Sequence, residues 1–224
     1  MKIADQRDAP ASPFRTREQR EEERSAKRLA LLVAAVRMFN ERGFHATLLE
    51  DVAASLGVSK PTIYHYLGNK ERVLLECIRL GIEQFREAID AARALPGNGL
   101  DRLRHFLRAY ACINMDDFGR CVIRTGVEPL SAEGAQVMRD QKRGIDAALR
   151  SFIEEGMADG SIAASDPKLL AFTLAGALNW PARWHAPGGP MSAGDIATQM
   201  VDILTTGLAP RRAEPSGKRG SGSV

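Results

Sequence analysis

The chain has 224 residues, of which 44% are apolar, 6% aromatic and 26% charged, with a formal net charge of +3. This length allows one sizeable hydrophobic core or two modest ones, and abundant Ala and Leu with few aromatics favour helices. No apolar run approaches the roughly 18 residues of a membrane span, and no signal-peptide core opens the chain. We therefore expect an all-α protein with no membrane partner.

Cysteine and histidine usage argues against metal sites and against most enzyme chemistry. Cys77, Cys112 and Cys121 are odd in number and form no C-x-x-C pair, so we expect neither structural disulfides nor zinc, and a reducing cytoplasm. The sequence contains no nucleophile elbow and no glycine-rich phosphate loop. We expect no catalytic residues, no metal and no cofactor.

The N-terminal residues 1–20 have no apolar periodicity at their start and are interpreted as a disordered arm. Basic and acidic residues then alternate from Arg15 to Arg28. Two interpretations stay open for this stretch: a solvated, salt-bridged start of a helix, or an arm that reaches DNA phosphate or the minor groove. Glu21 to Glu23 weaken the second interpretation.

A helix is predicted from about Ser25 to Arg42, closed by Gly43, because apolar residues recur there at helical spacing. Its stripe consists of Leu29, Leu32, Val33, Val36 and Phe39.

A helix-turn-helix is predicted next. Thr47 and Glu50 have the spacing of a capping box, and Gly57 can end the short helix that follows. Ser59 can cap a second helix that has Pro61 in its first turn. Two short helices joined in this way place the second helix in the DNA major groove.

On that second helix Ile63 and Leu67 are four residues apart and point inward. Tyr64 and Tyr66 cannot both lie on the inward face, so at least one aromatic side chain is left exposed. An exposed aromatic can pack on sugar-phosphate or thymine methyl groups, although core packing is the alternative. His65 has no ligand partner at metal-site spacing.

Residues 25–75 resemble the DNA-binding domain of the TetR family of transcriptional regulators. The matching features are Phe39-Asn-Glu-Arg-Gly43-Phe44, Thr47, Val52-Ala53, Gly57-Val58-Ser59, Ile63-Tyr64, Lys70-Glu71 and Leu74-Leu75. Leu67 and Pro61 depart from the family pattern, which usually has Phe at the first position and often Gly or Ala at the second.

The resemblance implies a double-stranded DNA operator as partner and a set of DNA contacts. It implies that Lys70, Thr47 and Tyr64 contact the DNA backbone, whereas Lys60, Thr62 and His65 are better placed for base edges. Together with their neighbours, the expected DNA-binding residues are Thr47, Ser59, Lys60, Pro61, Thr62, Tyr64, His65, Tyr66 and Lys70.

Further helices are predicted at about 70–94, 100–115, 118–127, 131–159, 166–180 and 192–208. Asn69, Ser131, Asp166 and Ser192 are their expected caps. The domain organisation expected from these patterns is an arm at 1–20, a three-helix DNA-binding domain at 21–69, a helical ligand-binding and dimerisation domain at 70–208, and a disordered tail at 209–224.

The last two long helices have broad apolar faces and small residues such as Ala171 and Gly176, which favour close packing with a second subunit. TetR-like proteins form a four-helix bundle from these two helices and their symmetry mates. A palindromic operator also needs two DNA-reading units about 34–36 Å apart. We therefore expect a homodimer.

The stretch from Trp180 to Trp184 contains both tryptophans of the chain around Pro181 and Arg183. It fills a dimer interface, or it forms the edge of a pocket in which Arg183 meets an anionic group. Gly176 to Trp180 with Arg183 and Trp184 resemble TetR-like regulators of lipid and acyl-CoA catabolism, whose effector is a CoA thioester. The expected ligand-binding residues are Phe106, Tyr110, Ile113, Cys121, Arg124, Met138, Gln141, Trp180, Arg183 and Trp184.

These patterns predict a ligand-responsive repressor, acting as a homodimer on a palindromic operator and released by a small apolar or anionic effector such as a CoA thioester or fatty acid. The alternative is a DNA-binding regulator or architectural protein without a small-molecule effector.

Overall fold

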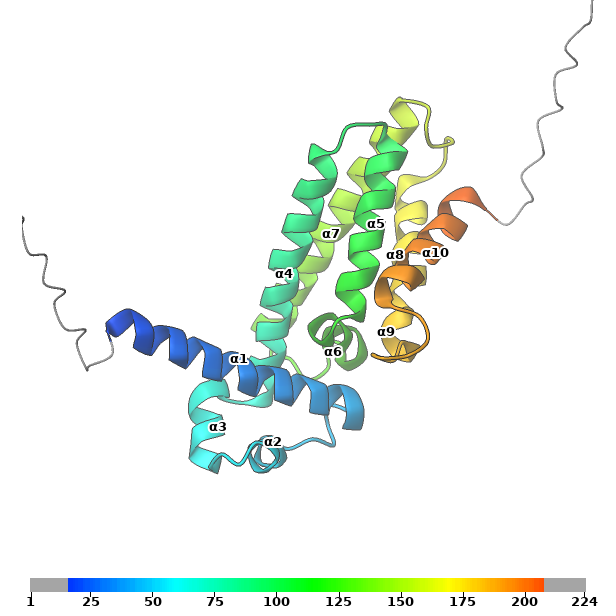
Figure 1. Cartoon of the computed structure of the whole chain (residues 1–224). Coiled ribbons are helices and arrows are strands. Elements are labelled where there is room, and N and C mark those ends of the chain that lie inside the picture. Colours follow the sequence, from blue (N-terminus) through cyan, green and yellow to red (C-terminus); the bar gives the residue numbers. More distant parts are fainter. Residues whose placement is uncertain (1–15, 208–224) are drawn as a thin grey trace, which may run out of the picture.

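The computed structural model describes residues 16–207, which form ten helices and no strand (Figure 1). The all-α fold class is therefore confirmed. The helices are α1 (Arg17–Arg42), α2 (Leu49–Ser55), α3 (Lys60–Leu67), α4 (Lys70–Ala94), α5 (Gly99–Met115), α6 (Asp117–Thr125), α7 (Ala132–Ala158), α8 (Pro167–Asn179), α9 (Pro181–Trp184) and α10 (Ala193–Thr206).

The beginnings of the helices follow local capping chemistry, as expected. The side chains of Ser59, Asn69, Ser131, Asp166 and Ser192 each accept a hydrogen bond from a backbone N–H in the first turn of the helix that follows. Such caps satisfy backbone donors that have no partner within the helix. These five predicted caps are confirmed.

The start of α1 differs from the prediction. The helix begins at Arg17, because Thr16 and Gln19 form a capping box, so residues 17–20 are helical and do not belong to a disordered arm. Leu29 was expected on the buried stripe but is 52% exposed, and Leu31 is buried instead, whereas Leu32 is buried as predicted. The predicted disorder of residues 1–15 and of the tail from 209 lies outside the described residues.

The capping box expected at Thr47 is also wrong. Helix α2 begins at Leu49, and the carboxylate of Asp51 accepts a hydrogen bond from the Leu48 N–H at 3.4 Å. The Thr47 hydroxyl is buried and donates to the carbonyl oxygens of Met38, at 3.3 Å, and Gly43, at 2.9 Å. Thr47 thus ties the α1–α2 connection to the end of α1.

Two hydrophobic cores lie one above the other, and α4 contributes to both. The lower core joins α1, α2 and α3 to the first half of α4, including Leu74 and Ile78. The upper core joins the second half of α4, including Phe85 and Ala92, to α5, α7, α8 and α10. With 25 residues at 1.5 Å each, α4 spans about 37 Å from one core to the other.

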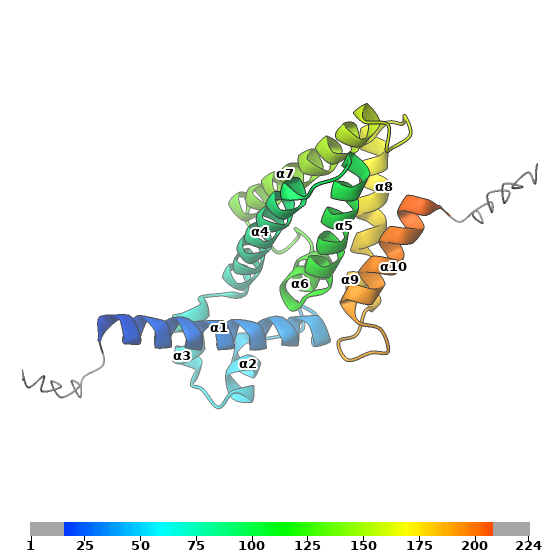
Figure 2. The ribbon, with the colours of Figure 1, turned by 45° about the horizontal axis from the view of Figure 1, so that its top comes forward.

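The helices α4 to α10 around the upper core form a unit that we call the upper unit. Its central helix is α5, which packs against α4, α7, α8 and α10 (Figures 1 and 2). Close backbone approach depends on glycine there: a Cβ on Gly99 would overlap the backbone of Gly156 in α7. Among the described residues no helix is both long and apolar enough to cross a membrane.

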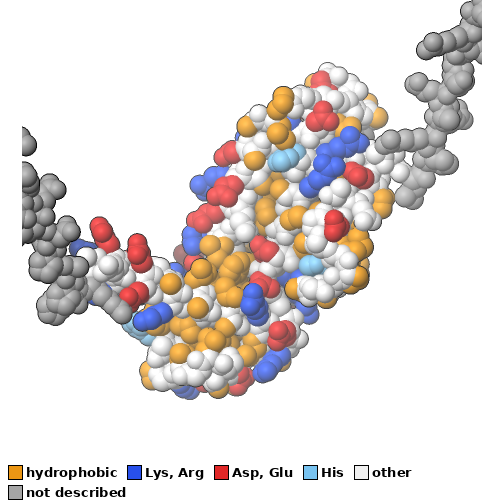
Figure 3. Space-filling model, viewed as in Figure 1, with side chains coloured by type: hydrophobic (Ala, Val, Ile, Leu, Met, Phe, Trp, Pro, Cys, Tyr) orange, Lys and Arg blue, Asp and Glu red, His pale blue; other side chains and the backbone are white. Residues whose placement is uncertain are grey.

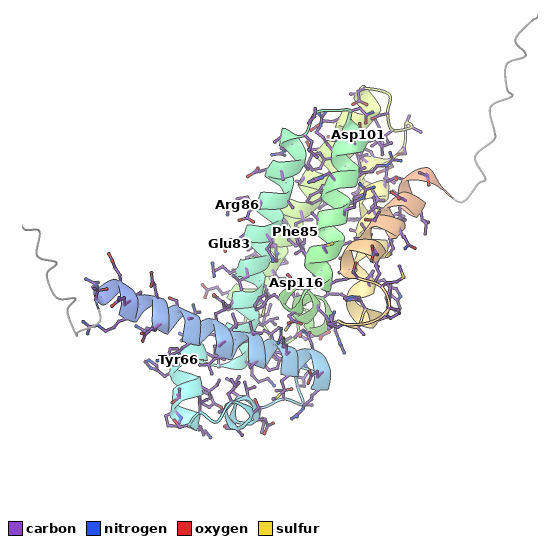
Figure 4. The ribbon with its side chains drawn as sticks, viewed as in Figure 1. Tyr66, Glu83, Phe85, Arg86, Asp101 and Asp116 are labelled. Carbon is purple, nitrogen blue, oxygen red and sulfur yellow. The ribbon has the colours of Figure 1, made fainter. Side chains whose placement is uncertain are left out.

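Helix α6 connects the two units through polar contacts. Arg37 on α1 forms an ion pair with Asp117 at 2.8 Å, and the Asn40 side-chain amide donates to the Asp117 carbonyl at 2.8 Å. Gln84 on α4 donates to the Asp116 carboxylate at 3.1 Å. Asp116 lies where α5 passes into α6 (Figure 4). A shift of α6 therefore acts on both α1 and α4.

Gly119 allows α6 to approach the end of α5, since a Cβ there would overlap the carbonyl oxygen of Ile113. We expect Gly119→Ala to lower the free energy of unfolding by about 1–3 kcal/mol, because the backbone must move. The matched control is Gly144→Ala on α7, where a Cβ meets nothing within 4 Å. That change should raise stability by about 0.5–1 kcal/mol. Urea unfolding followed by circular dichroism measures both, and equal effects would contradict the tight α5–α6 approach.

Candidate DNA-reading surface and ligand cavity

The outer face of α3 carries most of the polar residues that are predicted from the sequence to contact DNA. Ile63 and Leu67 are buried in the lower core, as predicted, and leave Lys60, Tyr64 and His65 exposed on the other side. The hydroxyls of Ser59 and Thr62 lie 2.8 Å apart, which fixes both at the start of the helix. The helix N-terminus, with its free backbone donors and partial positive charge, also faces outward.

Glu50 on α2 organises this face, a role that sequence reasoning missed. One of its carboxylate oxygens lies 2.8 Å from the Lys60 ammonium and accepts a hydrogen bond from the Tyr64 hydroxyl at 3.1 Å. The Lys60 ammonium lowers the pKa of Glu50, and Glu50 in turn raises the pKa of Lys60. The Lys60 ammonium thus has one carboxylate partner in the free protein and keeps further N–H donors for another group. The sequence pattern predicts a capping box for Glu50 and gives no sign of these contacts, since Glu50 and Lys60 lie on different helices.

Lys70 lies at the start of α4, next to the helix-turn-helix formed by α2 and α3. Its ammonium donates to the His45 carbonyl at 3.4 Å and lies 4.6 Å from the centre of the Phe44 ring. Partial burial lowers the pKa of Lys70. The charge is thus held in a fixed place beside the α1–α2 connection, which suits a contact with a single phosphate.

Two residues of the expected DNA-binding set are placed differently from the others. Thr47 is fully buried and its hydroxyl is already used by two backbone carbonyls, so we leave it out of the reading surface. Tyr66 is half-buried at the end of α3 and packs against the lower core, next to α1 (Figure 4). Tyr64, which is 39% exposed, is the aromatic left outside.

The upper unit contains a cavity of about 480 Å³ between α4, α5, α6, α7 and α8, extending to α9. Its lining is mainly apolar, and Phe172, Trp180 and Arg183 are exposed at its edge. This size and character are typical of small-molecule sites.

A hydrogen-bonded cluster of three side chains lines the cavity. The Tyr110 hydroxyl and the Asn114 amide both donate to the Asn179 side-chain oxygen, at 2.8 and 2.9 Å. Burial raises the pKa of Tyr110, so its hydroxyl stays protonated at neutral pH. Asn114 and Asn179 carry further donors and acceptors that a polar ligand group could use.

Of the ten residues expected to bind a ligand, six line this cavity: Tyr110, Ile113, Met138, Gln141, Trp180 and Arg183. The other four do not line it. Phe106 is fully buried between the rings of Tyr110 and Phe152, and Trp184 is 52% exposed outside. Cys121 is buried beside Cys77 and Thr125, and Arg124 is exposed on α6.

Several lining residues were not foreseen, among them Phe85, Asn114, Lys142, Ile145, Asp146 and Asn179. Asp146 pairs with Arg150 on the next turn of α7. No sequence signal separates Phe85 from Phe106, since both sit on apolar stripes of neighbouring helices. Figure 4 shows Phe85 on α4 facing α5.

Below the cavity, Arg120 on α6 is buried. Its guanidinium donates to the Met115 carbonyl and lies 3.0 Å from the His185 Nδ1. Burial lowers the pKa of Arg120, while burial and the nearby guanidinium lower the pKa of His185. A neutral imidazole can accept from Arg120, so this contact joins α6 to the segment after α9.

A helix-turn-helix with an exposed polar reading helix, joined by a long helix to a domain with a ligand-sized cavity, defines a DNA-binding transcriptional regulator. Two family models match the chain: "Bacterial regulatory proteins, tetR family" over residues 31–77 and "Tetracyclin repressor-like, C-terminal domain" over residues 96–208. The chain belongs to the TetR family. It is a regulator rather than an enzyme.

Similar proteins include the HTH-type transcriptional repressor KstR2 of Rhodococcus jostii strain RHA1. It is 28% identical over 193 residues, covering 83% of this chain and 93% of that protein. Among solved structures, the TetR family regulator PfmR from Thermus thermophilus has a TM-score of 0.73 at 29% identity and covers 80% and 99% of the two chains. AibR, solved in complex with isovaleryl coenzyme A and operator DNA, shares the fold with a TM-score of 0.70 at 24% identity, covering 80% and 98%.

Proposed function

We propose that this protein is a homodimeric repressor that binds a palindromic operator and is released by a small effector in the upper cavity. The observation that carries this proposal is the placement of the cavity on α4 and α6, the two helices that also contact the DNA-reading unit. The repressor KstR2 and the fold shared with AibR support it.

In the proposed mechanism Lys60, Thr62 and His65 face base edges, while Tyr64, Lys70 and the N-terminal end of α3 with Ser59 and Pro61 face the backbone. Charged and hydroxyl groups of these types are common at both kinds of contact. Tyr66 contributes by holding the end of α3 against the core.

The effector would occupy the cavity with its apolar part against Phe85, Ile113 and Ile145. A carbonyl or thioester group would meet the Tyr110, Asn114 and Asn179 cluster, and Arg183 or Lys142 would meet an anionic part at the edge. This combination fits an acyl-CoA thioester or a fatty acid. Preferred binding to the DNA-free arrangement would lower DNA affinity, typically by about 1–3 kcal/mol.

The proposed dimer uses α8 and α10. Both helices expose apolar side chains, with Leu169 at 67% and Ile203 at 51% accessibility. Hydrophobic side chains also appear over α9 and α10 in Figure 3. An exposed apolar face of this kind is typical of a subunit interface. Two-fold symmetry would then place two α3 helices in successive major grooves.

Thr62→Ala and Lys70→Ala test the reading surface. Thr62→Ala should change sequence preference, with about 1–3 kcal/mol lost at particular base pairs, because a base contact is removed. Lys70→Ala should weaken specific and random DNA alike and reduce the salt slope by about 0.9 for each phosphate that is no longer neutralised. Fluorescence anisotropy over a salt series measures both, and melting temperatures control for folding. Equal losses on specific and random DNA for both variants would contradict the assignment.

Arg183→Ala and Arg124→Ala test the cavity. Arg183 lines its edge and Arg124 does not, so only Arg183→Ala should reduce release of operator DNA by an acyl-CoA, while both variants keep DNA binding. A thermal-shift screen of acyl-CoAs and fatty acids on the wild type comes first, since a specific ligand raises the melting temperature. If no compound both stabilises the protein and weakens operator binding, the protein is a regulator without a small-molecule effector.

Leu169→Glu tests the dimer. It would place one buried charge from each subunit in the proposed interface, so sedimentation velocity should show a shift from dimer to monomer and operator affinity should fall. Leu29→Glu on α1 is the control for the sedimentation measurement alone, because Leu29 is similarly exposed but lies on a helix other than α8 and α10. A wild-type monomer, or a dimer unaffected by Leu169→Glu, would exclude this interface.

A further inference from the structure

The first turns of α1 project beyond the folded body. Residues 17–30 contribute nothing to either core, and the first buried residue of the helix is Leu31. Figures 1 and 2 both show this part of α1 extending past α3. At 1.5 Å per residue its 14 residues span about 21 Å, the length of about six base pairs of DNA. It buries no apolar stripe, and its arginine side chains are exposed to solvent.

The charges of this projection are sorted by helix face. Arg17, Arg20, Arg24 and Arg28 follow one another at spacings of three and four residues, so they form one stripe, which we call the basic stripe, with Lys27 beside it. Glu18 and Glu22 lie on the other side of the helix at 100° per residue. Glu21 and Glu23 flank the basic stripe.

The orientation of the basic stripe follows from its last member. Arg28 lies 3.4 Å from the Glu76 carboxylate on α4 and lines, with His65 and Tyr66, a cleft of about 360 Å³ at the end of α3. One turn further along the same face, Leu31 and Leu32 are buried with Ile63 of α3 in the lower core. The basic stripe is therefore the direct continuation of the α1 face that packs on α3.

We propose that the basic stripe binds the phosphate backbone of DNA that flanks the half-site read by α3. This inference rests on the proposed DNA-binding surface, with which the stripe is continuous through His65. Guanidinium groups along a helix face match a row of phosphates, and such contacts position a protein on a duplex. Each subunit then covers several base pairs more than the reading helix alone.

The Arg28–Glu76 ion pair adds a connection to the rest of the molecule. Glu76 also pairs with Arg79 at 2.9 Å, and these two arginines lower its pKa, with Arg79 the larger cause. The base of the basic stripe is thus attached to α4. When α4 tilts, the flanking contacts move together with α3.

The test compares two double variants that remove the same charge. R20Q/R24Q neutralises two exposed arginines of the basic stripe, and R139Q/R143Q neutralises two exposed arginines at the same spacing on α7, outside the helix-turn-helix. Binding of the full-length proteins is measured by anisotropy from about 0.05 to 0.3 M salt. Two duplexes carry the same operator: a short one ending at the half-sites, and a long one with about eight further base pairs on each side.

On the long duplex R20Q/R24Q should weaken binding about tenfold at 0.15 M salt and lower the salt slope by about 2–4, since up to four phosphates beside a dimer are then no longer neutralised. On the short duplex it should match the wild type. R139Q/R143Q should match the wild type on both.

Three results overturn the inference: an unchanged slope on the long duplex, an equal loss on the short duplex, or an equal loss from R139Q/R143Q. If the wild type binds no duplex at all, the proposed DNA-binding function has failed instead. Circular dichroism spectra and melting temperatures of both variants should match the wild type, so that a loss of binding by R20Q/R24Q cannot be attributed to unfolding.

Discussion

The structure depends on α4 being shared by two hydrophobic cores. Its first half is buried against the helix-turn-helix and its second half against α5 and α7, without interruption by proline. Phe85 in the upper core and Leu74 in the lower core are therefore parts of one uninterrupted helix. The cavity is lined by this helix at Cys77, Gly81 and Phe85.

Helix α6 gives the same two units a second, polar connection. Asp117 holds Arg37 and Asn40 of α1, while Asp116 caps α6 and accepts from Gln84 of α4. Hydrogen bonds of this kind require a defined distance and angle between donor and acceptor, whereas apolar contacts tolerate small shifts between the packed surfaces. The apolar connection through α4 and the polar connection through α6 both border the cavity. Together they offer a physical route from ligand to reading helix.

The outer face of α3 depends both on the local spacing of apolar residues and on a contact from a neighbouring helix. The spacing of Ile63 and Leu67 determines which side of α3 is buried, and hence which side is exposed. Glu50, from another helix, then determines where Lys60 and Tyr64 rest in the free protein. In the proposed function, the Glu50 carboxylate would reduce the attraction of this face for random phosphate, which favours discrimination between sequences.

The sequence by itself determined most of the helices, five of their caps and the inward face of α3, because these features depend on residues within four positions of one another. It also determined the family, through an ordered set of such local features. Only the tertiary structure decided that Thr47 is buried, that Glu50 holds Lys60, and that Phe85 lines the cavity while Phe106 fills the core. Those outcomes depend on which helices approach each other, and how closely, as Gly119 and Gly99 permit. Apolar periodicity records that a face is buried, but not what it is buried against.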